Sequence, residues 1–161
     1  MANNVLRSIG QRQHLRILAT DTDSLTEKVL GAVFEVSNTL GAGFLEKVYE
    51  RALLIELGIR GIQAKSQSSL AVTYKGHLVG EYFADMLVEE VLVIELKCVE
   101  RLGNEHMAQC LNYLRASGRG VCLLVNFQRP TVEWKRIICG QCLAMSSSNP
   151  KITTGIRAIA T

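Results

Sequence analysis

The stretch DMLVEEVLVIELK, residues 85–97, decides the fold of this chain. It reads as an outgoing strand, a turn at Glu89-Glu90 and a nearly all-apolar returning strand, which is the pattern of an antiparallel hairpin. Asp85 interrupts the outgoing arm, and Glu95 and Lys97 interrupt the returning arm. Because burial strips a charge of its hydration, charged groups in such a run need partners. The hairpin therefore predicts that these three side chains face one another or a common ligand.

The register of the hairpin decides whether the two acids meet. If the turn is symmetric about Glu90, Asp85 lies opposite Glu95, and opposed residues share a face of the sheet. Glu95 and Lys97 are two residues apart and share that face as well, whereas a slip of one residue would separate the acids. Two adjacent carboxylates repel each other unless one is protonated or a cation lies between them. Lys97 can neutralise one of them, and a divalent ion such as Mg²⁺, which prefers carboxylate oxygens, can neutralise both. A solvated hairpin with an ordinary ion pair is the alternative.

The residues before the hairpin predict two helices and one strand. The pattern Ser24-Leu25-Thr26-Glu27 is a capping box that predicts a helix start, and apolar residues then recur at helical spacing as far as Leu40. A second helix is expected over residues 45–57, ending at Gly58. The segment LAVTY (70–74), a turn at Lys75-Gly76 and the segment HLVGEYFADMLV (77–88) then complete a three-stranded antiparallel meander with the returning arm.

A helix is expected over residues 104–116, closed by Gly118, and two strands follow in GVCLLVNF (120–127) and TVEWKRII (131–138). The order of elements predicts an α/β fold. Its mixed central β-sheet would contain the three-stranded antiparallel meander plus further strands, and helices would flank it.

Length and composition limit the class of protein. With 161 residues, 48% of them hydrophobic, the chain is expected to form one domain, over residues 24–140. Residues 1–23 are predicted to be a loosely ordered leader, and residues 141–161 a tail rich in small and polar residues. No apolar run approaches the ~20 residues that a membrane helix needs. The net charge of +3 is compatible with an anionic partner but does not require one.

The five cysteines are an odd number spread over predicted helices and strands, which favours a reducing compartment such as the cytoplasm over a disulfide framework. Cys139 and Cys142 form a single C-x-x-C pair. A zinc site would need a second pair, so we interpret them as structural or incidental, with metal or redox chemistry as the alternative.

Several motifs in order resemble a known family. Asp85, then nine residues, then Glu95-Leu96-Lys97 resembles the D and E-x-K motifs of the PD-(D/E)XK nuclease superfamily, with Ala84 where a proline commonly stands. Residues 43–49 read G-x-x-E-x-x-Y, with Glu46 at their centre, and Gln109 and Tyr113 form Q-x-x-x-Y on the later helix. Together these motifs resemble the GxxExxY proteins, a branch of that superfamily, over residues 25–138.

The resemblance implies a PD-(D/E)XK nuclease-like core and a set of site residues. It implies that Asp85, Glu95, the backbone carbonyl of Leu96 and, directly or through water, Glu46 hold Mg²⁺ or Mn²⁺. Lys97 would orient a water molecule or stabilise charge on a phosphate, and Gln109 and Tyr113 would approach the metal or a DNA phosphate. Taken alone, an acid on a helix or a Q-x-x-x-Y pair is more often a solvated surface feature.

Two functions remain open from the sequence. The first is a divalent-metal-dependent nuclease (a hydrolase) that cleaves DNA, and the second is a catalytically silent module with the nuclease fold that binds nucleic acid or a protein partner. A homodimer would suit a small nuclease that must meet two strands. Tyr74, Lys75, Trp134, Lys135 and Arg136 are further candidates for a nucleic-acid surface, although basic residues at strand ends are more often simply solvated.

Overall fold

The computed structural model describes the backbone of residues 2–140 and 151–157, and the side chains of residues 21–140. Its elements follow in the order α1 (Ala2–Leu40), α2 (Glu46–Ile59), β1 (Ala64–Tyr74), β2 (His77–Val88), β3 (Leu92–Lys97), α3 (Asn104–Ser117), β4 (Val121–Asn126), β5 (Val132–Ile138) and β6 (Lys151–Arg157). In this part of the chain, six strands form one sheet in the order β1-β2-β3-β4-β5-β6. The predicted α/β class with a mixed sheet is confirmed.

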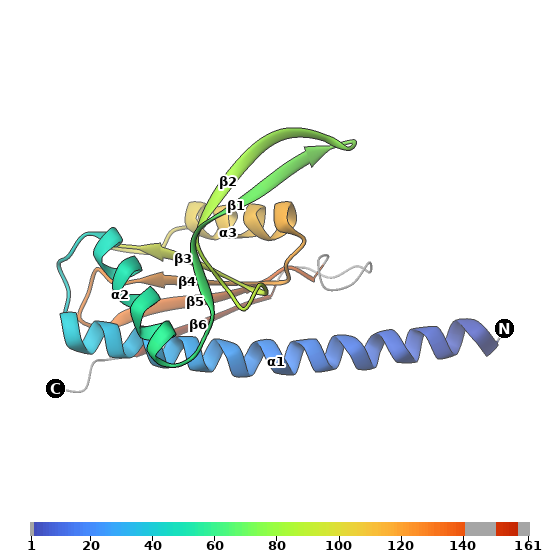
Figure 1. The fold of residues 1–161 in the computed structure, drawn as a ribbon, viewed down its shortest axis with the longest axis horizontal. Helices are drawn as coiled ribbons and strands as arrows, with labels where there is room; N and C mark the ends of the chain where they lie inside the picture. Colours follow the sequence, from blue (N-terminus) through green and yellow to red (C-terminus); the bar gives the residue numbers. More distant parts are fainter. Residues whose placement is uncertain (1, 141–150, 158–161) are drawn as a thin grey trace.

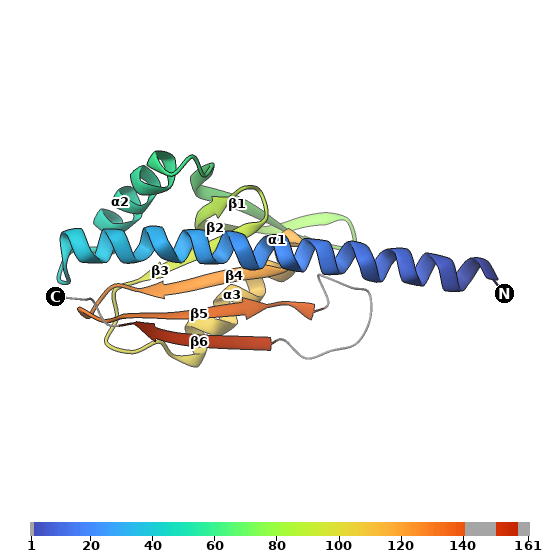
Figure 2. The ribbon, with the colours of Figure 1, turned by 90° about the horizontal axis from the view of Figure 1, so that it is seen from below.

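Helices cover both faces of the sheet. Figure 1 shows α1 on one side of the strands and α3 on the other, and in Figure 2 α1 crosses in front of the sheet while α3 lies behind it. The strands β3 and β4 are parallel and every other neighbouring pair is antiparallel. The helix α3 makes the parallel pair possible, because a chain that re-enters a sheet in the same direction needs a crossover connection.

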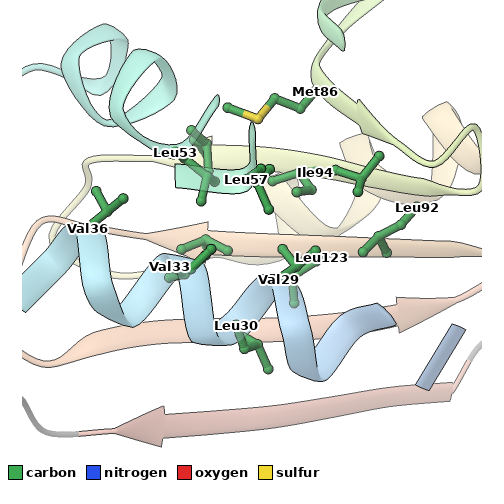
Figure 3. Close-up of a cluster of buried hydrophobic side chains, with 14 of the residues drawn as sticks. Val29, Leu30, Val33, Val36, Leu53, Leu57, Met86, Leu92, Ile94 and Leu123 are labelled. Carbon is green, nitrogen blue, oxygen red and sulfur yellow. The ribbon is translucent and has the colours of Figure 1, made fainter. Parts of the chain in front are cut away.

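Side chains of β3 alternate between two apolar clusters. Leu92, Ile94 and Leu96 pack with α1 and α2, whereas Val93 packs with α3 on the opposite face. Figure 3 shows the first cluster, in which side chains of α1 and α2 meet those of β2, β3 and β4. Because both faces are covered, β3 is buried from Leu92 to Leu96. The predicted apolar face of α1 is confirmed, since its members are buried or partly buried there: Leu25, Val29, Ala32, Val33, Val36 and Leu40.

The turn between β2 and β3 places two glutamates in left-handed backbone conformations. The φ angles are 49° at Glu89 and 60° at Glu90, which matches the primed turns that fit the twist of a hairpin. Such angles disfavour residues other than glycine and asparagine. Hydrogen bonds hold the turn: the N–H of Glu89 donates to the carbonyl of Gln63 at 2.9 Å, and the Glu89 carboxylate accepts from the Gln63 N–H at 2.8 Å. The turn therefore fixes the register from outside the hairpin as well as within it.

Two elements at the ends of the described chain differ from the boundaries expected above. The first helix begins at Ala2 and not at Ser24. The chain holds two prolines, Pro130 and Pro150, so no proline interrupts α1, and the Ser24 capping box lies inside the helix. The tail also contains a strand, since β6 pairs with β5 from Val132↔Arg157 to Ile138↔Lys151. Its β-branched residues suit a pleated edge position.

Other boundaries match closely. The helix α2 continues to Ile59 rather than ending at Gly58, and its chain reverses at Gly61, which has φ 70°. The predicted closure of α3 by Gly118 is confirmed, with φ 67° in the left-handed region. Among the described residues, no helix is long and apolar enough to span a membrane. Cys139 is buried, and its partner in the C-x-x-C pair, Cys142, lies outside the described residues.

Candidate active site

The hairpin register places Asp85 and Glu95 on one face of the sheet. The pairs Met86↔Ile94, Leu87↔Val93 and Val88↔Leu92 centre the hairpin on Glu90, as predicted. Continued by one residue, this register sets Asp85 opposite Glu95. The Oδ2 of Asp85 accepts a hydrogen bond from the Leu96 N–H at 2.7 Å, which ties the acid across to the E-x-K segment. The observed register excludes the one-residue slip that would have separated the acids.

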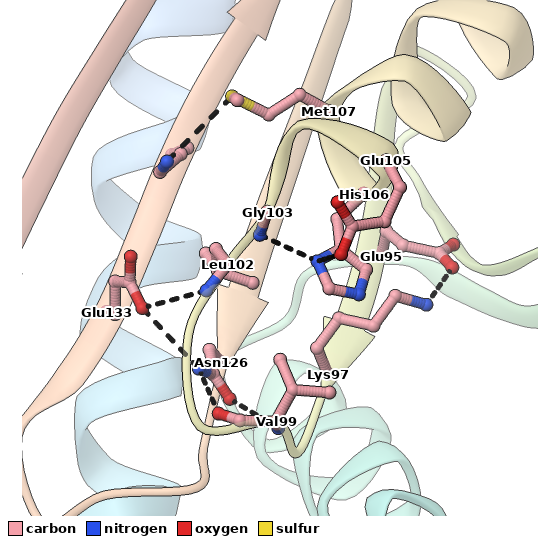
Figure 4. A network of polar contacts seen from close by, with 11 residues as sticks. Glu95, Lys97, Val99, Leu102, Gly103, Glu105, His106, Met107, Asn126 and Glu133 are labelled. Carbon is pink, nitrogen blue, oxygen red and sulfur yellow. Dashed lines mark hydrogen bonds and ion pairs between the residues drawn. The ribbon is translucent and has the colours of Figure 1, made fainter.

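Glu95 and Lys97 form a buried ion pair. The Nζ of Lys97 lies 2.7 Å from Oε1 of Glu95, and the Glu95 side chain is 4% exposed (Figure 4). Its second oxygen, Oε2, is buried and has no hydrogen-bond partner among the described residues. A buried carboxylate oxygen without a donor is costly, and each such group in a folded protein calls for an explanation. A cation beside Oε2 would supply the missing interaction.

The acids at this site resist ionisation. Burial, and then the neighbouring charge of Asp85, raise the pKa of Glu95 to about 7, against the opposing effect of Lys97. The pKa of Asp85 is also raised, mainly by burial, although its hydrogen bond from Leu96 acts in the opposite direction. The carboxylates raise the pKa of Lys97 despite its partial burial, so that its ammonium stays charged. Two acids that share one ammonium thus retain a proton near neutral pH when no other cation is present.

Each of the three defining residues of the G-x-x-E-x-x-Y motif has a structural role at the start of α2. Gly43 has φ 105°, a conformation that side chains with a Cβ rarely adopt. Three residues later, Glu46 is the first residue of α2, where the helix dipole favours an acid. The Tyr49 hydroxyl donates to the carbonyl of Gly41 at 2.6 Å and accepts from the Phe44 N–H at 3.3 Å. Its ring stacks on Phe127 at 4.5 Å between centroids. Glycine and tyrosine therefore position the glutamate between them.

Glu46 lies within the electrostatic reach of the hairpin acids. The pKa of Glu46 is raised overall, mainly by burial. Lys97 and a backbone hydrogen bond from Cys98 lower this pKa, whereas the charges of Asp85 and Glu50 raise it. Among the described residues, however, no three histidine, cysteine, aspartate or glutamate side chains are close enough together to hold a metal ion by themselves. Glu46 thus borders the Asp85–Glu95 pair rather than completing a closed ligand set.

The donor set suits a hard divalent cation. The available groups are carboxylate oxygens and the backbone carbonyl of Leu96, with Glu95 Oε2 lacking a partner among the described residues. Mg²⁺ usually binds through one or two carboxylates and keeps several waters. An incomplete set of protein ligands is therefore compatible with such a cation beside Asp85 and Glu95.

Gln109 and Tyr113 lie on one face of α3, close to the hairpin acids. The Nε2 of Gln109 donates to the Tyr113 hydroxyl at 2.6 Å. Burial, and then the charge of Glu95, raise the pKa of Tyr113 to about 12, so its hydroxyl keeps its proton at neutral pH. Because that hydroxyl already accepts from Gln109, its own proton remains free for a further acceptor. The structure thus brings Glu46, Asp85, Glu95, Lys97 and the Gln109–Tyr113 pair together.

Comparison with known proteins identifies the family. A model of the PD-(D/E)XK nuclease superfamily matches residues 23–137. The chain belongs to this superfamily. The matched segment includes every candidate site residue from Glu46 to Tyr113. Among solved structures, the chain is similar to an alkaline exonuclease from Laribacter hongkongensis, with 13% sequence identity over 78% of this chain and 76% of that chain and a TM-score of 0.36. A search of curated proteins finds no match.

One acidic residue near the candidate site was not singled out from the sequence. Glu50 is buried beside the candidate site, and its carboxylate binds Lys47 at 2.8 Å and accepts weakly from Gln67 at 3.3 Å. Its charge raises the pKa of Glu46 and of Asp85. The available signal was its spacing, because Glu50 stands four residues after Glu46 and shares its helix face.

Asn126, to which the sequence pattern assigned no role, holds the chain that leaves Lys97. Its side chain donates to the carbonyl of Val99 at 2.7 Å and accepts from the Val99 N–H at 3.1 Å. Figure 4 shows this contact beside the Lys97–Glu95 pair. His106 of α3 is largely buried and accepts from the Gly103 N–H at 2.9 Å. The polar Asn126 at the end of the apolar run VCLLVN was the visible signal.

The suggested basic residues of β5 have other contacts. Arg136 forms an ion pair with Asp23 of α1, and the Nζ of Lys135 lies 3.8 Å from the sulfur of Met107. Trp134 is partly buried against the core cluster of α1. Tyr74 and Lys75 remain exposed at the end of the β1–β2 hairpin. This leaves the hairpin as the better candidate for a binding surface.

Proposed function

We propose that the chain is a divalent-metal-dependent nuclease that hydrolyses phosphodiester bonds of DNA, and that it belongs to the GxxExxY branch of its superfamily. The observation that carries the proposal is the buried Asp85–Glu95–Lys97 arrangement, in which Glu95 Oε2 has no partner among the described residues. The superfamily membership supports cleavage of nucleic acid, and the Gly43–Glu46–Tyr49 turn supports the branch.

In this proposal, Asp85, Glu95 and the carbonyl of Leu96 hold Mg²⁺ or Mn²⁺, and Glu46 contributes through water. The ion supplies Lewis acidity toward a phosphate oxygen and toward water. Lys97, held at Glu95 and kept charged, stabilises the negative charge that develops on the phosphate. The neutral Tyr113 hydroxyl, fixed by Gln109, donates a hydrogen bond to a non-bridging phosphate oxygen.

The test is a cleavage assay on linear, nicked, branched and single-stranded DNA with Mg²⁺, Mn²⁺, Ca²⁺ or a chelator. Wild-type protein should cut only with a divalent ion, and Glu95→Gln and Lys97→Met should each lose at least roughly a hundredfold in rate. Glu27→Gln and Lys28→Met are matched controls, because both residues are exposed on α1 away from the site, and they should cut normally.

The assay also separates the second candidate function. Undiminished cutting by the Glu95 and Lys97 variants would refute this active site. If wild-type protein binds DNA equally well with and without chelator but never cuts it, the fold serves as a catalytically silent binding module.

A further inference from the structure

The β1–β2 hairpin extends past the covered part of the sheet and exposes aromatic side chains. Figure 1 shows the hairpin arching over the side of the sheet that carries α3. Toward its tip, the residues Tyr74, Tyr82 and Phe83 are 63%, 44% and 53% exposed. Large apolar groups gathered on one exposed element mark an interaction site more often than isolated ones do.

The strand register assigns these aromatic residues to two faces. Tyr82 pairs with Leu70, and Tyr74 pairs with His77. Leu70, Val72 and Tyr74 alternate with their neighbours along β1, and Leu70 packs in the cluster that contains α3. The pairing register shifts between Val72 and Thr73, where the extra residue lies on β2, at Val79, and not on β1. Phe83 pairs with Ser69 and so lies on the opposite face. Among the exposed aromatic residues of this hairpin, Tyr82 therefore lies on the α3 side, Tyr74 follows on the same side of β1, and Phe83 lies on the opposite side.

A groove lies between the hairpin and α3. It has a volume of about 390 Å³ and is lined by Val72, Thr73 and Tyr82 of the hairpin and by Asn112, Arg115 and Ala116 of α3. Below, "the hairpin groove" means this set of six residues. The Tyr82 ring meets the ring of Tyr113 edge-on, with 5.5 Å between centroids. The hairpin groove therefore adjoins Tyr113 of the candidate active site through one aromatic contact.

The charges around the hairpin groove are positive. Arg115 is exposed at its edge and forms no ion pair with the described residues. The Lys75 ammonium lies over the Tyr74 ring, 5.4 Å from its centre. The nearby acid Glu81 pairs with Ala71 on the opposite face of the hairpin, next to the Ser69 hydroxyl that it binds. Among the residues that the structure describes, no carboxylate lines the hairpin groove itself.

We propose that the hairpin groove binds a single-stranded segment of nucleic acid and leads it to the site of Asp85, Glu95 and Lys97. This proposal rests on the proposed function and names its substrate class. Bases of a single strand can stack on Tyr82 and Tyr74, while Arg115 and Lys75 contact the backbone phosphates. In a duplex the bases already stack on one another, so they offer no free face to these rings.

The test measures binding of a fluorescent oligothymidine of about 20 nucleotides, and of a blunt duplex of equal length, by anisotropy in chelator. Wild-type protein should bind the single strand at least about tenfold more tightly than the duplex. Tyr74→Ala and Arg115→Ala should each weaken single-strand binding by roughly fivefold or more. Phe83→Ala, an equally exposed aromatic on the other face of the same hairpin, is the matched control and should bind as wild type does.

A second measurement maps the contact directly. Photo-cross-linking of an oligonucleotide with 5-iodouracil should label peptides that contain Tyr74 or Tyr82. Equal affinity for both DNA forms, equal effects of the Tyr74 and Phe83 variants, or cross-links confined to Phe83 would each overturn the proposal. The result is separate from the nuclease test, because binding is measured in chelator, where no divalent ion is present to support cutting. If no ion-dependent cutting occurs but binding depends on Tyr74 and Arg115, the groove proposal stands and the nuclease proposal fails.

Discussion

At the scale of single residues, Glu95 is the acid of the candidate site whose ionisation the folded protein opposes most strongly. Its pKa is raised from 4.5 to about 7, mainly by burial and by Asp85. The folded state therefore keeps a proton over a pH range in which the unfolded chain has lost it. The stability that this proton contributes is fully present below pH 4.5 and is lost as the pH rises through about 7. Asp85 and Glu46, whose pKa values are also raised, act in the same direction.

Without divalent ions, the free energy of unfolding should fall between about pH 5 and about pH 8, with Glu95 contributing roughly 2 kcal/mol. Glu95→Gln should flatten this dependence and should be the more stable protein at the higher pH, because glutamine cannot lose a proton. Urea titrations across the pH range measure both effects. An unchanged pH profile in Glu95→Gln would show that this carboxyl titrates normally.

Divalent ions should reverse the trend. Because a cation and a proton compete for the Glu95 carboxylate, millimolar Mg²⁺ or Mn²⁺ should raise the Tm of the wild type more at about pH 8 than at about pH 6. Glu95→Gln should lose most of this stabilisation, and Glu27→Gln should keep it. Thermal melts with and without chelator provide the measurement. Equal stabilisation of all three proteins would place the ion elsewhere.

At the scale of elements, the start of α2 is held by Tyr49 rather than by an N-cap side chain. Leu45 occupies the cap position and makes no side-chain hydrogen bond. The Tyr49 hydroxyl instead bridges the Gly41 carbonyl and the Phe44 N–H, while its fully buried ring stacks on Phe127. This tyrosine connects α2, the preceding turn and the end of β4. It thereby fixes the position of Glu46 relative to the hairpin acids.

Tyr49→Phe should cost about 1–2 kcal/mol of stability, because it removes the hydroxyl but keeps the stacked ring. Tyr74→Phe, in which the hydroxyl belongs to an exposed ring, should cost almost nothing. Chemical denaturation of the two variants tests this. Equal stability of Tyr49→Phe and the wild type would show that the hydroxyl bonds do not hold the turn.

At the scale of the whole molecule, β6 closes one edge of the sheet. Its backbone pairs with all seven residues of β5, from Val132 to Ile138. Without it, β5 would expose a row of unpaired N–H and C=O groups, which is a template for aggregation. At the opposite edge of the sheet, β1 and its hairpin with β2 bend away from the other strands and pass over α3 (Figure 1).

Deleting residues 146–161 should lower the Tm by several degrees and increase aggregation, since about 1 kcal/mol corresponds to roughly 2–4 °C in a chain of this size. Deleting only residues 158–161, which follow β6, is the control and should change neither property. Thermal melts and light scattering report the outcome. A long deletion that melts like the wild type would show that β6 does not protect the edge.

The candidate site divides into a part that the sequence predicted and a part that it did not. The Asp85–Glu95 pairing follows from a two-residue period and a symmetric turn, and the shared face of Glu95 and Lys97 follows from their spacing. For Glu50 and Asn126 the local signals of spacing and polarity are too weak to assign a role, since that role comes from contacts with residues distant in sequence. The same holds for β6, whose pairing joins segments separated by 12 residues of connecting chain between Ile138 and Lys151.

The sequence by itself determined the order of the elements from α1 to β5, the register of the central hairpin and the type of charged group on its face, because each depends on local period and turn chemistry. Only the tertiary structure decided that Glu46, from a helix on the other layer, approaches the hairpin acids, and that Glu95 keeps a proton near neutral pH. Both outcomes depend on how far packing excludes water from a point where three elements meet. Desolvation is a property of the assembled layers and of no single segment.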